Sequence, residues 1–300
     1  MKIRSSSRAG RGTVAVLVAL AVVSSLLSVV PAAFAATPSG DCGSSGTFPS
    51  NCPAAVYSTV KSSPISTAGL STTNSGDLII AIVVAQSGDA ISTPKVGSTN
   101  MDGPVCAYAP SGQVEIWYLY EASPISSQNV SVNVTGSTSD GIGLIAFGVS
   151  GASSNAATDG TCGTGTSSSS NTPSVTLSSL SYSNDFIIGA VLATGSGSGV
   201  SAWSATSPTT LISSGIGAQG AKGGNAAGYQ LGVVGQTTQT VAFSISGSVA
   251  SWDEVAVALE ASSTTPIPLF PQGAIPVIVA TLGCYIIMRR RLRRAGAQVG

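Results

Sequence analysis

The feature that most constrains the fold of this chain is an internal repeat. Residues 77–85 read DLIIAIVVA, and residues 185–193, 108 positions later, read DFIIGAVLA. Residues 130–137 (VSVNVTGS) match residues 241–248 (VAFSISGS) at an offset of 111, so three residues are added between the matched segments. Because order, spacing and sequence agree, we interpret the chain as a duplicated unit.

Each half offers four or five strands, separated by Gly- and Pro-rich turns. At the offset of 111, residues 144–149 fall opposite residues 255–260. A half of this size buries little core alone. We therefore expect an all-β fold over residues 54–262: one duplicated, jelly-roll-like β-sandwich of about ten strands to which both halves (about 54–170 and 171–262) contribute. Two separate immunoglobulin-sized domains are the alternative. The expected strands lie near 56–60, 78–85, 114–121, 129–135 and 143–149, and then 174–178, 186–193, 227–233, 239–245 and 254–260.

The charges are segregated along the chain, although the formal net charge is zero. All twelve acids lie between Asp41 and Glu260, where the only cations are Lys61, Lys95 and Lys222, so this middle part carries −9. Backbone binding to nucleic acid needs clustered Lys and Arg. A nucleic-acid partner is therefore not expected.

The N-terminus has the pattern of a secretory signal peptide. A basic stretch ending at Arg11 precedes an apolar run over 14–30 and the small-residue site Ala33-Phe34-Ala35. Cleavage after residue 35 would make Ala36 the first mature residue. An uncleaved N-terminal anchor is the alternative, because the apolar run is long for a signal peptide.

The C-terminus predicts a transmembrane helix over 275–292. Eighteen helical residues span about 27 Å, close to one hydrocarbon core. Five arginines lie in 289–294, at the end of this helix and the beginning of the basic tail 293–300. The positive-inside rule places this tail in the cytoplasm. We therefore expect a single-pass protein at the cell surface, with its N-terminal domain outside.

A short segment that contains Pro266, Pro268, Phe270 and Pro271 precedes this helix, in the linker 263–274. With the helix and the Arg cluster it resembles the tripartite sorting signals of prokaryotic surface proteins, and most closely the archaeal signals read by archaeosortases. The resemblance implies a sortase-like processing enzyme as a partner; a plain membrane anchor is the alternative.

Four cysteines lie outside the membrane segments, where disulfides persist. Cys42 and Cys52 fall in the N-terminal segment 36–53, and Cys106 and Cys162 fall in the sandwich. Of the three possible pairings we favour Cys42–Cys52 with Cys106–Cys162, the second pair joining two long loops. A metal site is the rival, but the chain has no His and no Cys-x-x-Cys spacing.

Two further features concern the surface. Asn129 and Asn133 begin glycosylation sequons and alternate with valines, so both side chains should point outward on one face of a strand. Trp203, in a Ser- and Gly-rich stretch, is the aromatic residue we expect to be an exposed ligand contact. Trp117, inside an apolar run, is expected in the core.

The sequence offers few residues suited to catalysis. Without His, Ser-His-Asp and Cys-His mechanisms are excluded. Paired carboxylates could still hydrolyse a glycosidic bond, but the candidates are better explained as charges at strand ends. They are Glu115, Glu121, Asp253 and Glu254. Calcium would need clustered carboxylates, and the loop acids Asp102, Asp140 and Asp159 form no such run. We expect no catalytic residues and no cofactor.

Three segments carry a second resemblance. Residues 76–80 (GDLII), 114–118 (VEIWY) and 145–151 (IAFGVSG) resemble a sandwich module common in prokaryotic surface and phage-tail proteins. With the tail, this resembles archaeal surface proteins that carry a Ser/Thr/Gly-rich β-sandwich ectodomain. The resemblance implies a structural or adhesive surface protein. A carbohydrate- or protein-binding surface module is the alternative, and a glycan-active enzyme is a third hypothesis.

Overall fold

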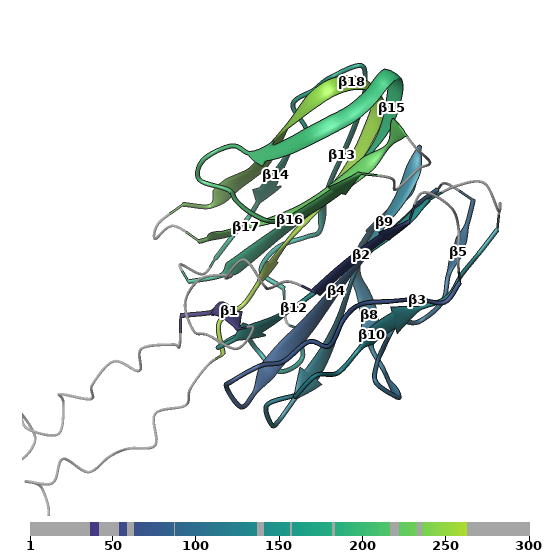
Figure 1. Cartoon of the computed structure of the whole chain (residues 1–300). Helices are drawn as coiled ribbons and strands as arrows, with labels where there is room; N and C mark the ends of the chain where they lie inside the picture. The colour runs from purple at the N-terminus through teal and green to yellow at the C-terminus, as the bar shows by residue number, and fades with distance from the viewer. Residues whose placement is uncertain are drawn as a thin grey trace, which may run out of the picture. The chain divides into compact units, whose positions relative to one another are not determined.

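In the computed structural model the described residues lie within Ala35–Ser263. They are 37–41, 54–58, 63–86, 88–136, 141–156, 158–181, 184–216, 222–232 and 236–262. Every strand or helix assigned in these ranges is a β-strand (Figure 1). The all-β prediction is therefore confirmed.

The first half builds one large antiparallel sheet. Its strands lie in the order β1-β12-β4-β9-β8, and β2 also pairs with β12. Strand β4 has the apolar run of the repeat, and nine of its ten residues are buried because both of its faces are covered. The strands are β1 (Ser39–Asp41), β2 (Ala54–Ser58), β4 (Asp77–Gln86), β8 (Asp102–Tyr108), β9 (Gly112–Glu121) and β12 (Ile142–Ser150).

Short strands cover one face of this sheet. They form a four-stranded sheet in the order β3-β10-β6-β7 and a two-stranded sheet of β5 and β11. Successive segments of the chain thus alternate between the large sheet and the short strands. The short strands are β3 (Ile65–Ser66), β5 (Ala90–Ile91), β6 (Lys95–Val96), β7 (Thr99–Asn100), β10 (Val130–Val132) and β11 (Val134–Thr135).

The second half repeats the arrangement with longer strands. Its sheet has the order β13-β18-β15-β17-β16, and β14 pairs with the first part of β18. Strand β18 is continuous where the sequence predicted two strands, over 239–245 and 254–260, and β15 extends well beyond its predicted end at 193. The strands are β13 (Gly163–Ser168), β14 (Ser174–Ser178), β15 (Phe186–Ala205), β16 (Thr210–Ile216), β17 (Gly224–Leu231) and β18 (Thr238–Leu259).

Strand register shows the duplication directly. Leu78 pairs with Tyr120 on β9, and Phe186 pairs with Leu231 on β17, as offsets of 108 and 111 require. The last strand of each half departs from the predicted alignment by one residue. Ile145, Phe147 and Val149 face the same core as Val255, Val257 and Leu259, an offset of 110. The predicted offset of 111 for this strand is wrong, and in a strand a shift of one residue exchanges the two faces.

The two halves meet through their large sheets. One hydrophobic cluster contains residues from both, for example Ile80 and Phe147 from the first half and Ile188 and Val257 from the second. Each half also has a cluster of its own, on the opposite face of its sheet. The two large sheets share no strand; the second takes β13, which lies before the expected division at about residue 170, so the second half as the structure has it begins with the segment that contains Cys162. The described residues thus form several antiparallel sheets, and each half is also layered itself, because β4 and β15 carry apolar side chains on both faces.

Polar contacts cross the same interface. The hydroxyl groups of Tyr57 on β2 and Ser213 on β16 are 3.0 Å apart. Burial raises the pKa of Tyr57 to about 12, which the bond to Ser213 partly offsets. On β18, Asp253 accepts hydrogen bonds from the backbone N–H groups of Ser111 (3.1 Å) and Gly112 (2.5 Å) at the start of β9. The interface thus has specific partners as well as apolar contact.

Candidate functional site

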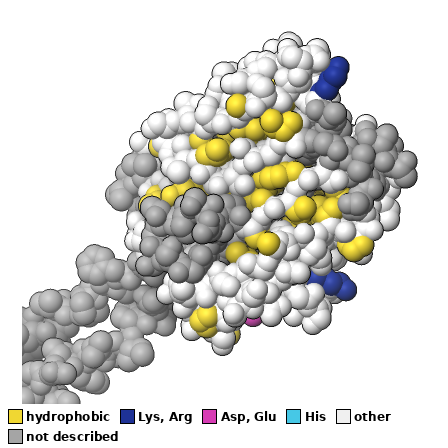
Figure 2. All heavy atoms as spheres, viewed as in Figure 1, with side chains coloured by type: hydrophobic (Ala, Val, Ile, Leu, Met, Phe, Trp, Pro, Cys, Tyr) yellow, Lys and Arg dark blue, Asp and Glu magenta, His cyan; other side chains and the backbone are white. Residues whose placement is uncertain are grey.

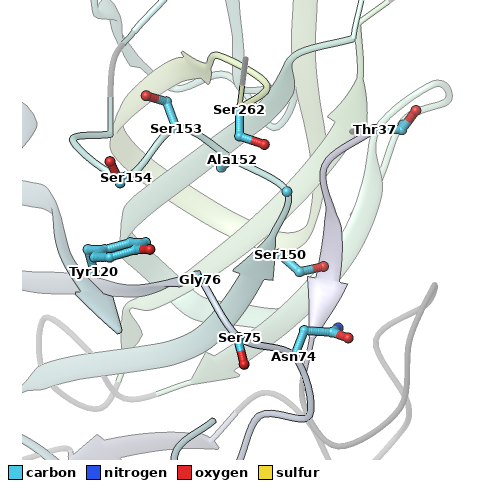
Figure 3. A pocket seen from close by; sticks show the side chains of 11 residues that line it. Thr37, Asn74, Ser75, Gly76, Tyr120, Ser150, Ala152, Ser153, Ser154 and Ser262 are labelled. Atoms are coloured by element: carbon cyan, nitrogen blue, oxygen red, sulfur yellow. The ribbon is translucent and has the colours of Figure 1, made fainter. Parts of the chain in front are cut away.

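An open cavity of about 580 Å³ lies where the first and last described segments of the domain come together (Figure 3). Its walls come from the turn before β4, the end of β9, the end of β12 with the loop after it, and both ends of the domain. We call it the hydroxyl cavity, because hydroxyl groups dominate its lining. The lining residues are Thr37, Asn74, Ser75, Gly76, Tyr120, Ser150, Gly151, Ala152, Ser153, Ser154 and Ser262.

Backbone hydrogen bonds hold the end of the domain against this cavity. The N–H of Ser262 donates to the carbonyl oxygen of Gly151 at 2.8 Å, and the N–H of Ser153 donates to that of Glu260 at 2.9 Å. The chain therefore returns from the second half to the loop after β12 of the first half. This return completes the wall.

A buried carboxylate fixes the opposite wall. Asp41 on β1 accepts hydrogen bonds from the N–H and hydroxyl of Thr73, at 3.0 and 2.9 Å. It also accepts from the backbone and side-chain N–H groups of Asn74, both at 2.7 Å. Four donors from two neighbouring residues thus converge on one carboxyl group. Asn74 is therefore held in place at the cavity.

Tyr120 supplies the aromatic side of the cavity. Its side chain is 40% exposed, although it lies within β9. Gly76 lies beside it with φ +78°, a conformation that L side chains rarely adopt, and its N–H donates to the carbonyl oxygen of Glu121 at 3.1 Å. The turn therefore passes close to Tyr120 and leaves its ring and hydroxyl accessible.

The lining suits a neutral ligand that carries hydroxyl groups. Serine, threonine and tyrosine hydroxyls and the Asn74 amide can each donate and accept hydrogen bonds. The ring of Tyr120 offers an apolar surface with a polar tip. The lining contains no Asp, Glu, Lys or Arg side chain. The cavity can therefore bind such a ligand, and its described lining contains no acid–base pair for catalysis.

The four carboxyl groups considered for catalysis lie outside the hydroxyl cavity, and each has different surroundings. Glu115 accepts hydrogen bonds from Gln113 at 2.6 Å and from the indole of Trp117 at 2.8 Å. Asp253 joins the two halves, and Glu254 is fully buried in β18. Glu121 ends β9 opposite Asp77. Glu115, Asp253 and Glu254 are buried within their strands, so the expectation of rim charges is wrong for these three.

The acids considered for calcium do not meet. Asp102 is exposed on β8, Asp159 is buried, and Asp140 lies outside the described residues. Within the described part of the chain, no group of three or more His, Cys, Asp or Glu side chains could hold a metal ion.

Cys106 and Cys162 form a disulfide, with their Cα atoms 5.4 Å apart. This confirms the predicted pairing but corrects its position. Cys106 lies within β8, a strand of the first large sheet, and Cys162 directly precedes β13 of the second. The bond therefore joins the two halves across their shared core. Cys42 and Cys52 lie outside the described residues, and their bond stays a prediction.

Trp203 does not lie in an exposed loop, as the sequence predicted. It lies in β15, is half-buried and packs against the core cluster of the second half. Its indole nitrogen is buried without a hydrogen-bond partner. The Ser- and Gly-rich stretch forms a strand because it pairs with β18, where Trp203 lies opposite Ile245. Trp117 is buried in the core, as predicted.

Asn129 and Asn133 are both exposed, while Val130, Val132 and Val134 are buried. The predicted alternation is confirmed. The side-chain oxygen of Asn133 accepts a hydrogen bond from the Ser63 hydroxyl at 3.3 Å. Both amides are accessible, and glycosylation stays a prediction.

The predicted signal peptide, the transmembrane segment and the motif residues Pro266, Pro268, Phe270 and Pro271 lie outside the described residues. In the described part of the chain no helix is long and apolar enough to cross a membrane. Comparisons with protein-family models, with curated proteins and with solved structures find no match to this chain.

Proposed function

We propose that this chain is a cell-surface protein without catalytic activity. Its duplicated, jelly-roll-like β-sandwich would stand outside the cell on the C-terminal transmembrane helix, in a structural or adhesive role. The observation that carries the proposal is that Thr37 and Ser262 line one cavity. Both ends of the domain therefore leave it at one pole, so a membrane anchor after residue 262 would leave the remote surface available for contact.

The disulfide supports an extracellular position. Cys106 is buried at 2% exposure and joins the two halves through Cys162. Such bonds are rare in the reducing cytosol and persist outside the cell. The same bond would keep the halves together under the conditions of an exposed surface.

The surface composition fits the same role. Figure 2 shows a face on which charged side chains are sparse among uncharged polar ones. The two exposed sequon asparagines lie on the first half, away from the interface between the halves. A weakly charged, hydroxyl-rich surface is suited to many weak polar contacts with neighbouring surface molecules.

Domain-specific antibodies test the topology. Antibodies to residues 54–262 should label intact cells that express the full chain, while a tag after Gly300 should be reached only after permeabilisation. A tag that is labelled on intact cells would contradict the orientation. Intact mass decides the processing: a chain ending at Gly300 indicates a plain anchor, and an end near 266–271 indicates a sortase-like enzyme.

The hydroxyl cavity favours a second candidate function, a module that binds neutral saccharides. Tyr120→Ala should abolish retention of a glycan that the full chain binds on an array, since it removes the aromatic surface. Tyr120→Phe should retain part of the binding. Leu231→Ala is the control, because Leu231 is exposed and lies outside the cavity. Equal binding by all variants would exclude the cavity as the site.

A further inference from the structure

Three carboxyl groups, those of Asp77, Asp185 and Glu254, are completely buried, and each of these residues is 0% exposed. Among the described residues, neither side-chain oxygen of Glu254 has a hydrogen-bond partner, while Asp77 lies against the Thr72 hydroxyl and Asp41, and Asp185 lies against Asp159. An ionised carboxylate in such a place would lose its hydration without compensation, which is among the most costly states a core can contain. The protonated, neutral acid is far less costly to bury.

Two of these groups are duplicated with the fold. Asp77 begins β4 and Asp185 directly precedes β15, the equivalent strands of the two halves. Each has a second aspartate beside it, Asp41 in the first half and Asp159 in the second. Each half therefore contains a pair of neighbouring carboxyl groups, and the second aspartate of the pair comes from β1 in the first half and from the segment before β13 in the second.

The charged groups around these pairs are also acids. Glu121 on β9 lies opposite Asp77 in the sheet, and Glu260, just after β18, acts on Asp185. The described cations are Lys95 on β6 and Lys222 before β17, and neither is among the groups that shift these pKa values. Repulsion between acids therefore adds to the effect of burial.

The pKa values move in one direction. Burial is the main cause for Asp77, whose pKa rises to about 6; Asp41 adds to the rise and the Thr72 hydroxyl opposes it. Burial and then Asp159 and Glu260 raise the pKa of Asp185 to about 7. Burial alone raises the pKa of Glu254 well above its usual value. Its neighbours across β13 and β15 are Gly165 and Val191, which carry no charge.

We propose that this domain is built to fold in an acidic medium, with Asp77, Asp185 and Glu254 buried as neutral acids, and that neutral pH weakens it. A group whose pKa is raised by folding contributes its full stability below the pKa of the unfolded chain, about 4. That stability is lost as the pH rises through the folded values, here about 6 for Asp77 and about 7 for Asp185. The ends of β4 and β15 and the core around Glu254 would loosen first.

Thermal unfolding of the purified full chain in the presence of a chelator tests the proposal. The melting temperature should be highest near pH 4 to 5 and fall by about 5 °C or more by pH 8. The triple variant Asp77→Asn, Asp185→Asn, Glu254→Gln should lose most of this fall, because amides stay neutral at every pH. The exposed Asp102→Asn is the matched control and should leave the fall unchanged.

Several results would overturn the proposal. One is a stability maximum at pH 7 to 8, and another is an unchanged fall in the triple variant. A third is full recovery of the melting temperature at pH 8 on adding Ca²⁺, which would make the paired carboxylates cation ligands. If the triple variant does not fold, Glu254→Gln alone decides. It should melt higher than the unchanged chain at pH 8 and equally at pH 4.5, and a lower value at pH 8 would count against the proposal.

Discussion

Leu144 and Glu254 occupy the same position in the two halves of the domain. Leu144 on β12 pairs with Val83 on β4, and Glu254 on β18 pairs with Val191 on β15. Both are completely buried. One half therefore places an apolar side chain where the other buries a carboxyl group.

Glu254→Leu should stabilise the domain at neutral pH. The change removes an unsatisfied buried acid, which costs about 1–3 kcal/mol, and Leu144 shows that leucine suits the equivalent site. Urea unfolding at pH 7.5 measures the gain. Leu144→Ala is the contrasting change and should lose about 2–5 kcal/mol. A destabilised Glu254→Leu variant would show that the two sites differ in shape.

Replacing both Cys106 and Cys162 by Ala should lower the free energy of unfolding by about 2–4 kcal/mol, because the bond closes a long loop between the two halves. Denaturant unfolding measures the loss. Non-reducing peptide mapping checks both bonds at once and should also find Cys42 joined to Cys52. Four free thiols would contradict the oxidising compartment.

A chain that ends at Ser170 should aggregate or stay unfolded. It would expose the shared-core face of its large sheet, including Ile80 and Phe147, to water. Contiguous apolar surfaces of this kind cause association. Calorimetry and size-exclusion chromatography decide. A soluble half with its own cooperative melting transition would show that the hydrophobic cluster on the other face of its sheet is enough to fold it.

Removing residues 264–300 should release the domain into the medium, because the other apolar segment is predicted to be cleaved. Replacing the five arginines of 289–294 by neutral residues should weaken membrane retention without changing the melting of the domain. Cell fractionation measures both changes. If the shortened chain still sediments with membranes, the N-terminal segment is an uncleaved anchor.

The long apolar strands were predictable from the sequence because their periodicity is strong. The runs that form β4 and the first part of β15 are covered on both faces, and such strands contain continuous apolar residues. The short strands β5 to β7 are each only two residues long, too short for an alternating pattern. Their existence depends on tertiary pairing, so no local pattern indicates them.

The site was less predictable. Ser262 is far along the chain from Ser150 and Ser153 and meets them through the backbone hydrogen bonds of Ser262 to Gly151 and of Ser153 to Glu260. In a sequence this rich in serine, nothing distinguishes them. The buried acids did leave a signal: Asp77 and Asp185 head the matched segments of the repeat, where an acid beside an apolar run is unusual.

The continuity of β18 affects how the domain would respond to a mechanical load. Its 22 residues pair with β15 on one side and with β14 and β13 on the other, and residues 260–262 are hydrogen-bonded to the loop after β12. A pull on the C-terminal end would load the hydrogen bonds of residues 260–262 first. Once these break, it would act along a central strand and load the hydrogen bonds on both sides of β18 together, in shear. Unzipping them one at a time would need a force across the strand. A domain anchored at its C-terminus would thus be pulled in the direction in which its sheet resists unfolding most strongly.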